Sequence, residues 1–104
     1  MKHDEAELQA EVVDYLRGKW CVVVSIPNER NLGIADAKRM QLMGLTKGAP
    51  DLLVWDMKGK PYWFELKTKT GKRTLEQQCF EHLANQLNIT YKVVRSLNDV
   101  KDLI

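Results

Sequence analysis

Residues 51–67, which read DLLVWDMKGKPYWFELK, constrain the fold of this chain more than any other segment. Two apolar, β-prone runs, DLLVW and YWFEL, flank DMKGKP, in which a glycine and a proline supply turn chemistry. The pattern predicts a β-hairpin. Because hairpin strands are antiparallel, the start of the first strand lies level with the end of the second. We therefore expect Asp51 beside Glu65 and Lys67.

The side chains of the second strand alternate between the two faces of the sheet, so Glu65 and Lys67 point away from Phe64 and Leu66. Two neighbouring carboxylates repel, and one tends to stay protonated unless a cation lies between them. Mg²⁺ and Mn²⁺ are hard ions that choose oxygen ligands and keep bound waters. A nearby ammonium would stabilise negative charge that develops on a phosphate. The segment therefore predicts a metal-dependent phosphodiesterase site.

The rest of the chain alternates helical and strand patterns, which predicts a single α/β domain over residues 1–104. The expected elements are a helix at 4–17, a strand at 20–26 buried on both faces, a helix or helical loop at 31–45, a helix from Thr74 to about Leu87, a strand at 91–96 and a short helix at 98–104. In the helix that follows the hairpin, Thr74 and Gln77 have capping-box spacing. The residues of that helix expected to face inward are Leu75, Gln78 or Cys79, Leu83 and Leu87.

The composition is that of an ordinary globular protein, with 44% hydrophobic and 29% charged residues, which argues against disordered and fibrous classes. Cys21 and Cys79 have no further Cys or His at ligand spacing, so we expect reduced, buried thiols rather than a zinc site. No apolar run approaches membrane length and the N-terminus lacks an apolar signal region, so we expect a cytoplasmic protein that makes no membrane contact.

Basic residues gather around the hairpin although the net charge is only +2. One segment contains Glu65 as its only acid between residues 58 and 73 and carries six cations: Lys58, Lys60, Lys67, Lys69, Lys72 and Arg73. Lys69, Lys72 and Arg73 follow the hairpin in a loop that is solvated in most proteins. Beside a phosphodiesterase site, contact with the scissile phosphate is an equal alternative for these three residues.

A third acid for the metal site is available on the N-terminal helix. At 100° per residue, Glu5 lies on the same side as the apolar residues Leu8, Val12 and Leu16. A carboxylate on the core face is costly unless it has a partner, and a metal ion is one such partner. We therefore select Glu5 as a further metal ligand.

At this point the chain resembles a known family. "GAPDLLVW" and "FELK" resemble the Pro-Asp and Glu-x-Lys parts of the PD-(D/E)xK nuclease superfamily, and the surrounding segments resemble its VRR-NUC branch. Those segments, in the family's order, are "EAELQ", "IPNER", "MGLTKGAPDLLV", "FELKTKTGKRTLEQQCF" and "YKVVRSLNDV". The resemblance spans nearly the whole chain. It implies a restriction-endonuclease-like core, with a mixed central sheet of about four strands flanked by helices.

The resemblance also implies roles for individual residues. Asp51 and Glu65 would hold Mg²⁺ or Mn²⁺ together with the Leu66 backbone carbonyl, Lys67 would be the catalytic lysine, and Glu5 and Gln77 would complete the site. Further DNA contacts are expected from Asn28, Arg30 and Lys47. Where the family often has a proline before the glutamine, this chain has Leu75.

The function implied by the resemblance is that of a metal-dependent DNA endonuclease, similar to homodimeric Holliday-junction-resolving nucleases of phage or bacterial type that act in DNA repair and recombination. A C₂ dimer would supply the two symmetric cuts that a four-way junction needs. Apolar candidates for the dimer contact are Trp20, Met40, Met43, Leu45 and Trp55. The alternatives are a flap, nick or duplex endonuclease, a nucleic-acid-binding module that does not cleave, and a protein-interaction domain.

Overall fold

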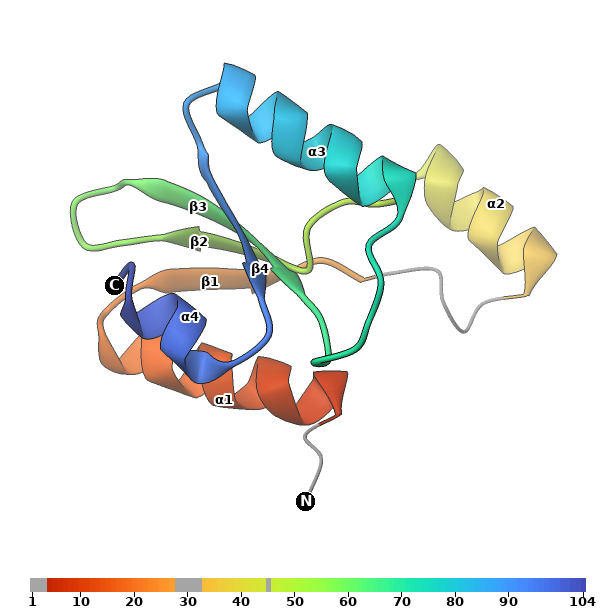
Figure 1. Cartoon of the computed structure of the whole chain (residues 1–104). Helices are drawn as coiled ribbons and strands as arrows, with labels where there is room; N and C mark the ends of the chain where they lie inside the picture. Colours follow the sequence, from red (N-terminus) through yellow and green to blue (C-terminus); the bar gives the residue numbers. More distant parts are fainter. Residues whose placement is uncertain (1–3, 28–32, 45) are drawn as a thin grey trace.

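The computed structural model of the chain describes residues 4–27, 33–44 and 46–104. The elements follow the order expected from the sequence (Figure 1): α1 (Glu5–Gly18), β1 (Val22–Ser25), α2 (Ile34–Leu42), β2 (Leu52–Trp55), β3 (Pro61–Leu66), α3 (Leu75–Gln86), β4 (Thr90–Val94) and α4 (Leu97–Lys101). Within these covered ranges, no helix has the length and apolar character needed to span a membrane.

The strands form one mixed sheet in the order β1-β2-β3-β4. β2 and β3 make the predicted antiparallel hairpin, with Leu52 opposite Phe64, and β1 pairs antiparallel with β2. β4 runs parallel to β3 because α3 provides the crossover that a parallel pair requires. The predicted α/β fold with a mixed four-stranded sheet is confirmed.

The apolar core lies between the sheet and the helices α1 and α4. Alternate residues of β2 and β3 point into it and are fully buried, as are three residues of α1 spaced by one helical turn. The buried cluster consists of Leu8, Val12, Leu16, Cys21, Leu52, Val54, Tyr62, Phe64, Leu66, Val94 and Val100. This buried face of the sheet packs beneath the strand ends at which Asp51 and Glu65 lie.

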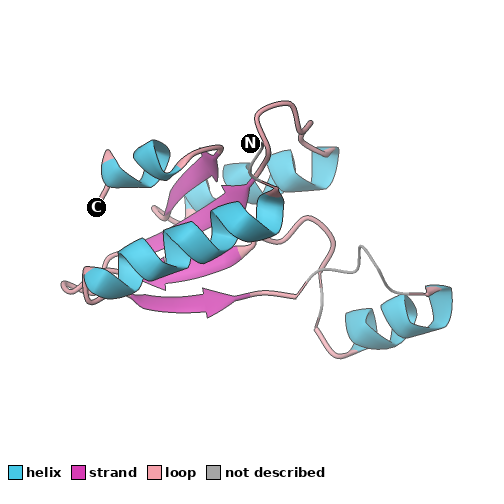
Figure 2. Cartoon of the chain, turned by 90° about the horizontal axis from the view of Figure 1, so that it is seen from below, coloured by secondary structure: helices cyan, strands magenta, loops and turns pink. Residues whose placement is uncertain are grey.

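The expectation that the first strand is buried on both faces is wrong. Val22 and Val24 are 59% and 45% exposed, whereas Val23 packs against the core. Val22 lies opposite Trp55 and Val24 opposite Leu53, so all four share the face of the sheet that α3 approaches. α3 contacts β4 and lies over the β3 side of the sheet, which leaves the β1 side of that face open (Figures 1 and 2).

The predicted inward face of α3 is also wrong. Leu75, Leu83 and Leu87 are 73%, 40% and 55% exposed, and Gln78 and Cys79 are exposed as well. The helix instead turns Phe80 and Ala84 to the sheet, where Phe80 meets Trp63 edge-on and Ala84 is fully buried. A short side chain at the contact allows close approach. The prediction of two buried thiols therefore holds for Cys21 but not for Cys79.

The segment predicted as helical at 31–45 contains the nine-residue helix α2, which stands apart from the sheet in both views (Figures 1 and 2). Leu42 at its end is 90% exposed. The chain then returns to the sheet through Pro50, which is buried directly before Asp51.

Candidate active site

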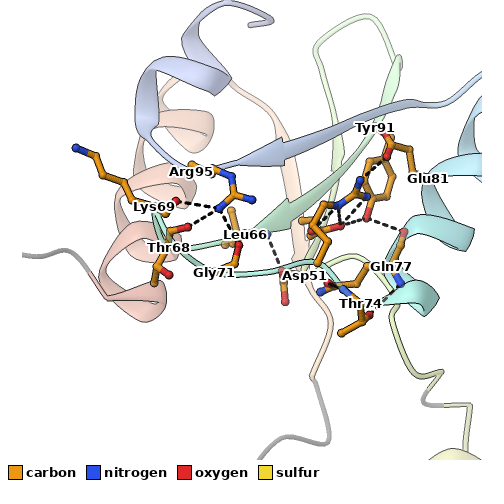
Figure 3. A network of polar contacts seen from close by, with 12 residues as sticks. Asp51, Leu66, Thr68, Lys69, Gly71, Thr74, Gln77, Glu81, Tyr91 and Arg95 are labelled. Atoms are coloured by element: carbon orange, nitrogen blue, oxygen red, sulfur yellow. Dashed lines mark hydrogen bonds and ion pairs between the residues drawn. The ribbon is translucent and has the colours of Figure 1, made fainter.

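Asp51 lies directly before β2, at the end of the sheet where β3 finishes. Its backbone N–H donates to the Phe64 carbonyl at 3.0 Å, and its carboxylate oxygen Oδ2 accepts from the Leu66 N–H at 2.7 Å (Figure 3). The Asp51 carboxylate is therefore held against the backbone between Glu65 and Lys67. The predicted proximity of these residues is confirmed.

Glu65 is 1% exposed and lies on the face of β3 that α3 approaches. The Arg73 Nε donates to both of its carboxylate oxygens, at 3.3 Å to Oε1 and 3.1 Å to Oε2, and the Arg73 Nη2 donates to Oε1 at 3.1 Å. The Tyr91 hydroxyl donates to Oε1 at 2.6 Å. A buried carboxylate is tolerated only when it is paired and hydrogen-bonded, and these contacts meet that requirement.

Arg73 links the strand to the helix that covers it. Its Nη1 donates to Glu81 Oε1 of α3 at 2.7 Å, while its other nitrogens bind Glu65. The Arg73 side chain is 22% exposed, so it is not the solvated loop cation that the basic segment suggested. The only signal in the sequence for this contact is the requirement that a buried Glu65 have a cation.

Arg73 and Tyr91 differ in charge. The pKa of Arg73 is raised, chiefly by its hydrogen bonds to Glu65, so Arg73 stays a cation at any working pH. Burial, and then the hydrogen bond to Glu65, raise the pKa of Tyr91, so its hydroxyl remains a neutral donor. One partner of Glu65 therefore supplies charge and the other supplies only a hydrogen bond.

Lys67 directly follows β3 and is 7% exposed. Its N–H donates to the Val94 carbonyl at 2.9 Å, which extends the β3–β4 pairing by one residue. Within residues 4–27, 33–44 and 46–104 its ammonium makes no hydrogen bond or ion pair, and that nitrogen is not sealed from solvent. A buried stem with an accessible ammonium suits contact with an anion at this sheet end.

The loop after Lys67 is shaped by Arg95, a residue to which no sequence pattern points. The Arg95 Nη1 donates to the carbonyls of Thr68, Lys69 and Gly71 at 2.7, 3.3 and 2.9 Å (Figure 3). These bonds fix the backbone while the Lys69 side chain remains exposed. Lys72, in the same loop, is exposed as well.

The first turn of α3 begins with the predicted capping box. The Gln77 N–H donates to Thr74 Oγ1 at 3.2 Å, and the Thr74 N–H donates to Gln77 Oε1 at 2.8 Å. The side-chain oxygen of Gln77 is therefore engaged in holding the helix start beside Arg73. Nearby, the exposed Lys47 forms an ion pair of 3.6 Å with Glu76.

Glu5 is half-buried in the first turn of α1. One turn further on, Gln9 Nε2 donates to Ser25 Oγ at 3.1 Å, and Ser25 lies opposite Leu52, the residue after Asp51. The start of α1 is therefore at the same sheet end as Asp51. Among the residues that the structure describes, no three Asp, Glu, His or Cys side chains come close enough to form a metal-binding group, so Glu5 is not part of such a cluster here.

The remaining expected DNA contacts and the other lysines of the basic segment lie away from this part of the structure or outside it. Asn28 and Arg30 lie outside the described residues. Lys58 and Lys60 lie in the turn that joins β2 to β3, at the opposite end of the hairpin from Asp51. These two lysines belong to the basic segment 58–73 but are separated from the candidate site by the length of the hairpin.

The donor atoms at this sheet end suit a hard divalent cation in their chemistry. The Asp51 and Glu65 carboxylates and the Leu66 carbonyl all provide oxygen, the donor that such ions prefer. The Glu65 oxygens, however, already accept from Arg73. The residues thus fit a cation in donor type and charge, but one of them is already neutralised.

The fold matches those of two solved structures. One is described as a VRR_NUC domain and aligns with a TM-score of 0.70 and 21% identity, over 95% of this chain and 91% of that one. The other is described as a VRR_NUC domain protein and aligns with a TM-score of 0.73 and 16% identity, over 99% and 86% of the two chains. No family model and no curated protein matches the sequence. The chain thus has the fold of VRR-NUC domains, as the sequence resemblance implies.

Proposed function

We propose that this chain is a VRR-NUC family nuclease, a single domain that hydrolyses phosphodiester bonds in DNA with the help of a divalent cation. The main support is the hydrogen bond from the Leu66 N–H to the Asp51 carboxylate, because it joins the acid of one strand to the Glu65-x-Lys67 segment of the next. Glu65 and Lys67 are 1% and 7% exposed, which argues against a solvated strand face with a weak ion pair.

The proposed roles follow from chemistry and position. Asp51, Glu65, the Leu66 carbonyl and Glu5 would hold Mg²⁺, for which Mn²⁺ is a substitute. A bound cation would polarise the phosphate and lower the pKa of the attacking water. Lys67 would place its ammonium against the same phosphate and stabilise the charge that develops there.

Further residues are proposed to bind or orient the DNA. Gln77 would keep the start of α3 in place at the edge of the site, through its bonds with Thr74. The proposed phosphate contacts are Asn28, Arg30, Lys47, Lys69, Lys72 and Arg73. Phosphate contacts of this kind position a duplex without selecting its sequence.

The proposed substrate is a Holliday junction, cut by a homodimer during bacterial or phage DNA repair or recombination. Two protomers related by a two-fold axis would supply the paired incisions. Of the apolar candidates for the contact, Trp20, Met43 and Trp55 are 79%, 74% and 37% exposed, Met40 is half-buried, and Leu45 lies outside the described residues. Light scattering coupled to gel filtration tests the dimer, and a monomeric mass at micromolar concentration contradicts it.

Cleavage of labelled four-way junction, flap and plain duplex DNA, each with Mg²⁺, Mn²⁺ or EDTA, tests the proposed activity. Wild type should make paired symmetric cuts in the junction, and EDTA, Asp51→Asn and Lys67→Ala should abolish them. Lys58→Ala, at the opposite end of the hairpin, is the matched lysine control and should cut as wild type does. Cutting of all three substrates would retain the nuclease and favour the flap, nick or duplex alternative.

One observation favours a second candidate, a nucleic-acid-binding module that does not cleave. The Glu65 carboxylate is neutralised by Arg73, an arrangement that is stable without a metal ion. Salt-dependent DNA binding by wild type, with no cleavage in any metal, would select this candidate. Loss of both binding and cleavage would reject the nuclease and leave a protein-interaction domain.

A further inference from the structure

Both oxygens of the Glu65 carboxylate already accept hydrogen bonds in this conformation. Its Oε1 accepts from the Tyr91 hydroxyl and from two nitrogens of Arg73, and its Oε2 accepts from the Arg73 Nε. The residue retains 1% of its possible exposure. Arg73 is 22% exposed and is therefore the partner that lies between Glu65 and solvent.

Direct coordination of a divalent cation conflicts with this arrangement. Mg²⁺ requires near-octahedral oxygen ligands at about 2.1 Å and keeps several of its waters. A guanidinium that bonds both oxygens of a carboxylate occupies the directions from which such an ion would approach, and its charge repels the ion. The hydrogen bond from Tyr91 presents no such conflict, because it uses only Oε1 and carries no charge.

We propose that Arg73 and the divalent cation exchange at Glu65, an inference that rests on the proposed metal site. In the metal-free protein Arg73 neutralises Glu65, and on metal binding it releases both carboxylate oxygens while the Tyr91 hydroxyl stays hydrogen-bonded to Oε1. Glu81, at 2.7 Å from the Arg73 Nη1, retains the displaced guanidinium near the site. Because the Arg73 side chain reaches solvent, a DNA phosphate can then become its new partner.

Three observations favour exchange over a permanent supporting contact. The Nε of Arg73 bridges the two carboxylate oxygens instead of leaving one open. Arg73 already has a second acid, Glu81, that can keep its charge paired after release. It also precedes the N-cap Thr74 in the loop before α3, so its side chain can move without disturbing a strand.

The effect of removing Arg73 on metal affinity distinguishes exchange from a permanent supporting contact: exchange predicts tighter metal binding, and a supporting contact predicts equal or weaker binding. Mn²⁺ binding is measured by isothermal titration calorimetry at pH 8 for wild type, Arg73→Gln, Tyr91→Phe and Asp51→Asn. If the released state is less than about a tenth of the wild-type population, Arg73→Gln should bind Mn²⁺ at least about tenfold more tightly. Tyr91→Phe removes a hydrogen bond to Glu65 but no charge, so it should bind no more tightly than wild type.

The Asp51→Asn arm separates failure of the exchange from failure of the site. If wild type binds Mn²⁺, Asp51→Asn does not, and Arg73→Gln binds equally or more weakly, the metal site stands and the exchange is wrong. If neither wild type nor Arg73→Gln binds Mn²⁺, the proposed metal site fails and the exchange fails with it.

A measurement on the wild-type protein decides the matter even if Arg73→Gln does not fold. The Arg73 Nε–H signal, assigned by its loss in Arg73→Lys, is followed by NMR during titration with Mg²⁺. Exchange predicts that the signal shifts and that its proton exchanges faster with water once Mg²⁺ is bound. An unchanged, protected signal at a Mg²⁺ concentration that shifts the Leu66 amide would overturn the proposal.

Discussion

Two hydrogen bonds from a tyrosine to a carboxylate lie at opposite ends of β3, and they are built differently. At the hairpin turn, Asp56 accepts from the backbone N–H groups of Lys58 and Lys60, both at 2.9 Å, and from the Tyr62 hydroxyl at 3.1 Å. At the other end, Glu65 has only the side chains of Tyr91 and Arg73 as partners among the described residues.

The difference separates an acid that builds a turn from an acid to which the proposed function assigns a chemical role. The backbone donors to Asp56 lie at most four residues away in the sequence, and its side-chain donor, Tyr62, lies six residues away. When the turn forms, these hydrogen bonds to the Asp56 carboxylate form with it. Glu65 is instead fully buried and depends on one side chain, that of Arg73, for its charge balance. An acid whose counter-ion can leave can accept another cation, whereas an acid bonded to its own turn cannot.

Removing the cation beside each of the two acids, Glu65 and Asp56, should give the largest difference in stability between the two ends of β3. In EDTA, Arg73→Gln should lower the free energy of unfolding by about 4 kcal/mol, because it leaves a buried carboxylate without its counter-charge. Lys60→Gln removes the exposed cation beside Asp56 and should cost far less, because an exposed ion pair contributes little to stability. Urea unfolding measures both variants, and equal losses would remove the distinction between the two ends.

Two glycines test how tightly the chain is packed in the loop before Asp51 and in the turn between β2 and β3. Gly48 and Gly59 both have φ +82°, but a Cβ on Gly48 would lie 2.5 Å from Glu76 Cβ and 2.6 Å from its backbone carbon, whereas a Cβ on Gly59 would meet nothing within 4 Å. Gly59→Ala should cost about 1 kcal/mol from the left-handed backbone alone. Gly48→Ala should cost about 3 kcal/mol, because the loop before Asp51 must also move away from α3. Thermal melts of the two variants should therefore differ, and matching melting temperatures would mean that the loop is not held against α3.

Removing the hydroxyl of Tyr91 or of Tyr62 should give a smaller difference in stability between the two ends of β3. Tyr91→Phe should lower the free energy of unfolding by about 2 kcal/mol, since it removes a short bond to a buried charge. Tyr62→Phe should cost about 1 kcal/mol, because Asp56 keeps two backbone donors. Chemical denaturation resolves the difference, and a larger loss in Tyr62→Phe would reverse the assigned order.

Features that depend on short stretches of sequence were predictable. The hairpin, the capping box of Thr74 with Gln77 and the position of Asp51 opposite the end of β3 each involve local spacing or the alternation of one strand pair. These features already place the candidate metal ligands Asp51 and Glu65 together. Their roles in catalysis stay a prediction.

The counter-ion of Glu65 could not be predicted, because its contacts depend on how distant elements pack. Tyr91 reaches Glu65 only because β4 runs parallel to β3 with Trp63 opposite Tyr91, and strand order is not written in either segment. The inward face of α3 was missed for a related reason. Counting leucines selects the most apolar stripe, but the helix turns Phe80 and Ala84 to the sheet and pairs Glu81 with Arg73.

The smallest expected effect concerns acid pH and the Asp56 turn. The backbone N–H of Lys60, and then that of Lys58, the Tyr62 hydroxyl and the Lys60 charge, hold the pKa of Asp56 below its usual 3.8. A carboxylate whose pKa is lower in the folded state contributes stability that is present above its unfolded pKa and is lost as the pH falls through the folded one. The difference in melting temperature between wild type and Asp56→Asn should therefore be constant above about pH 5 and shrink below about pH 4. A difference that stays the same from neutral to strongly acid pH would mean that the charge of Asp56 does not stabilise the turn, and that its shape alone does.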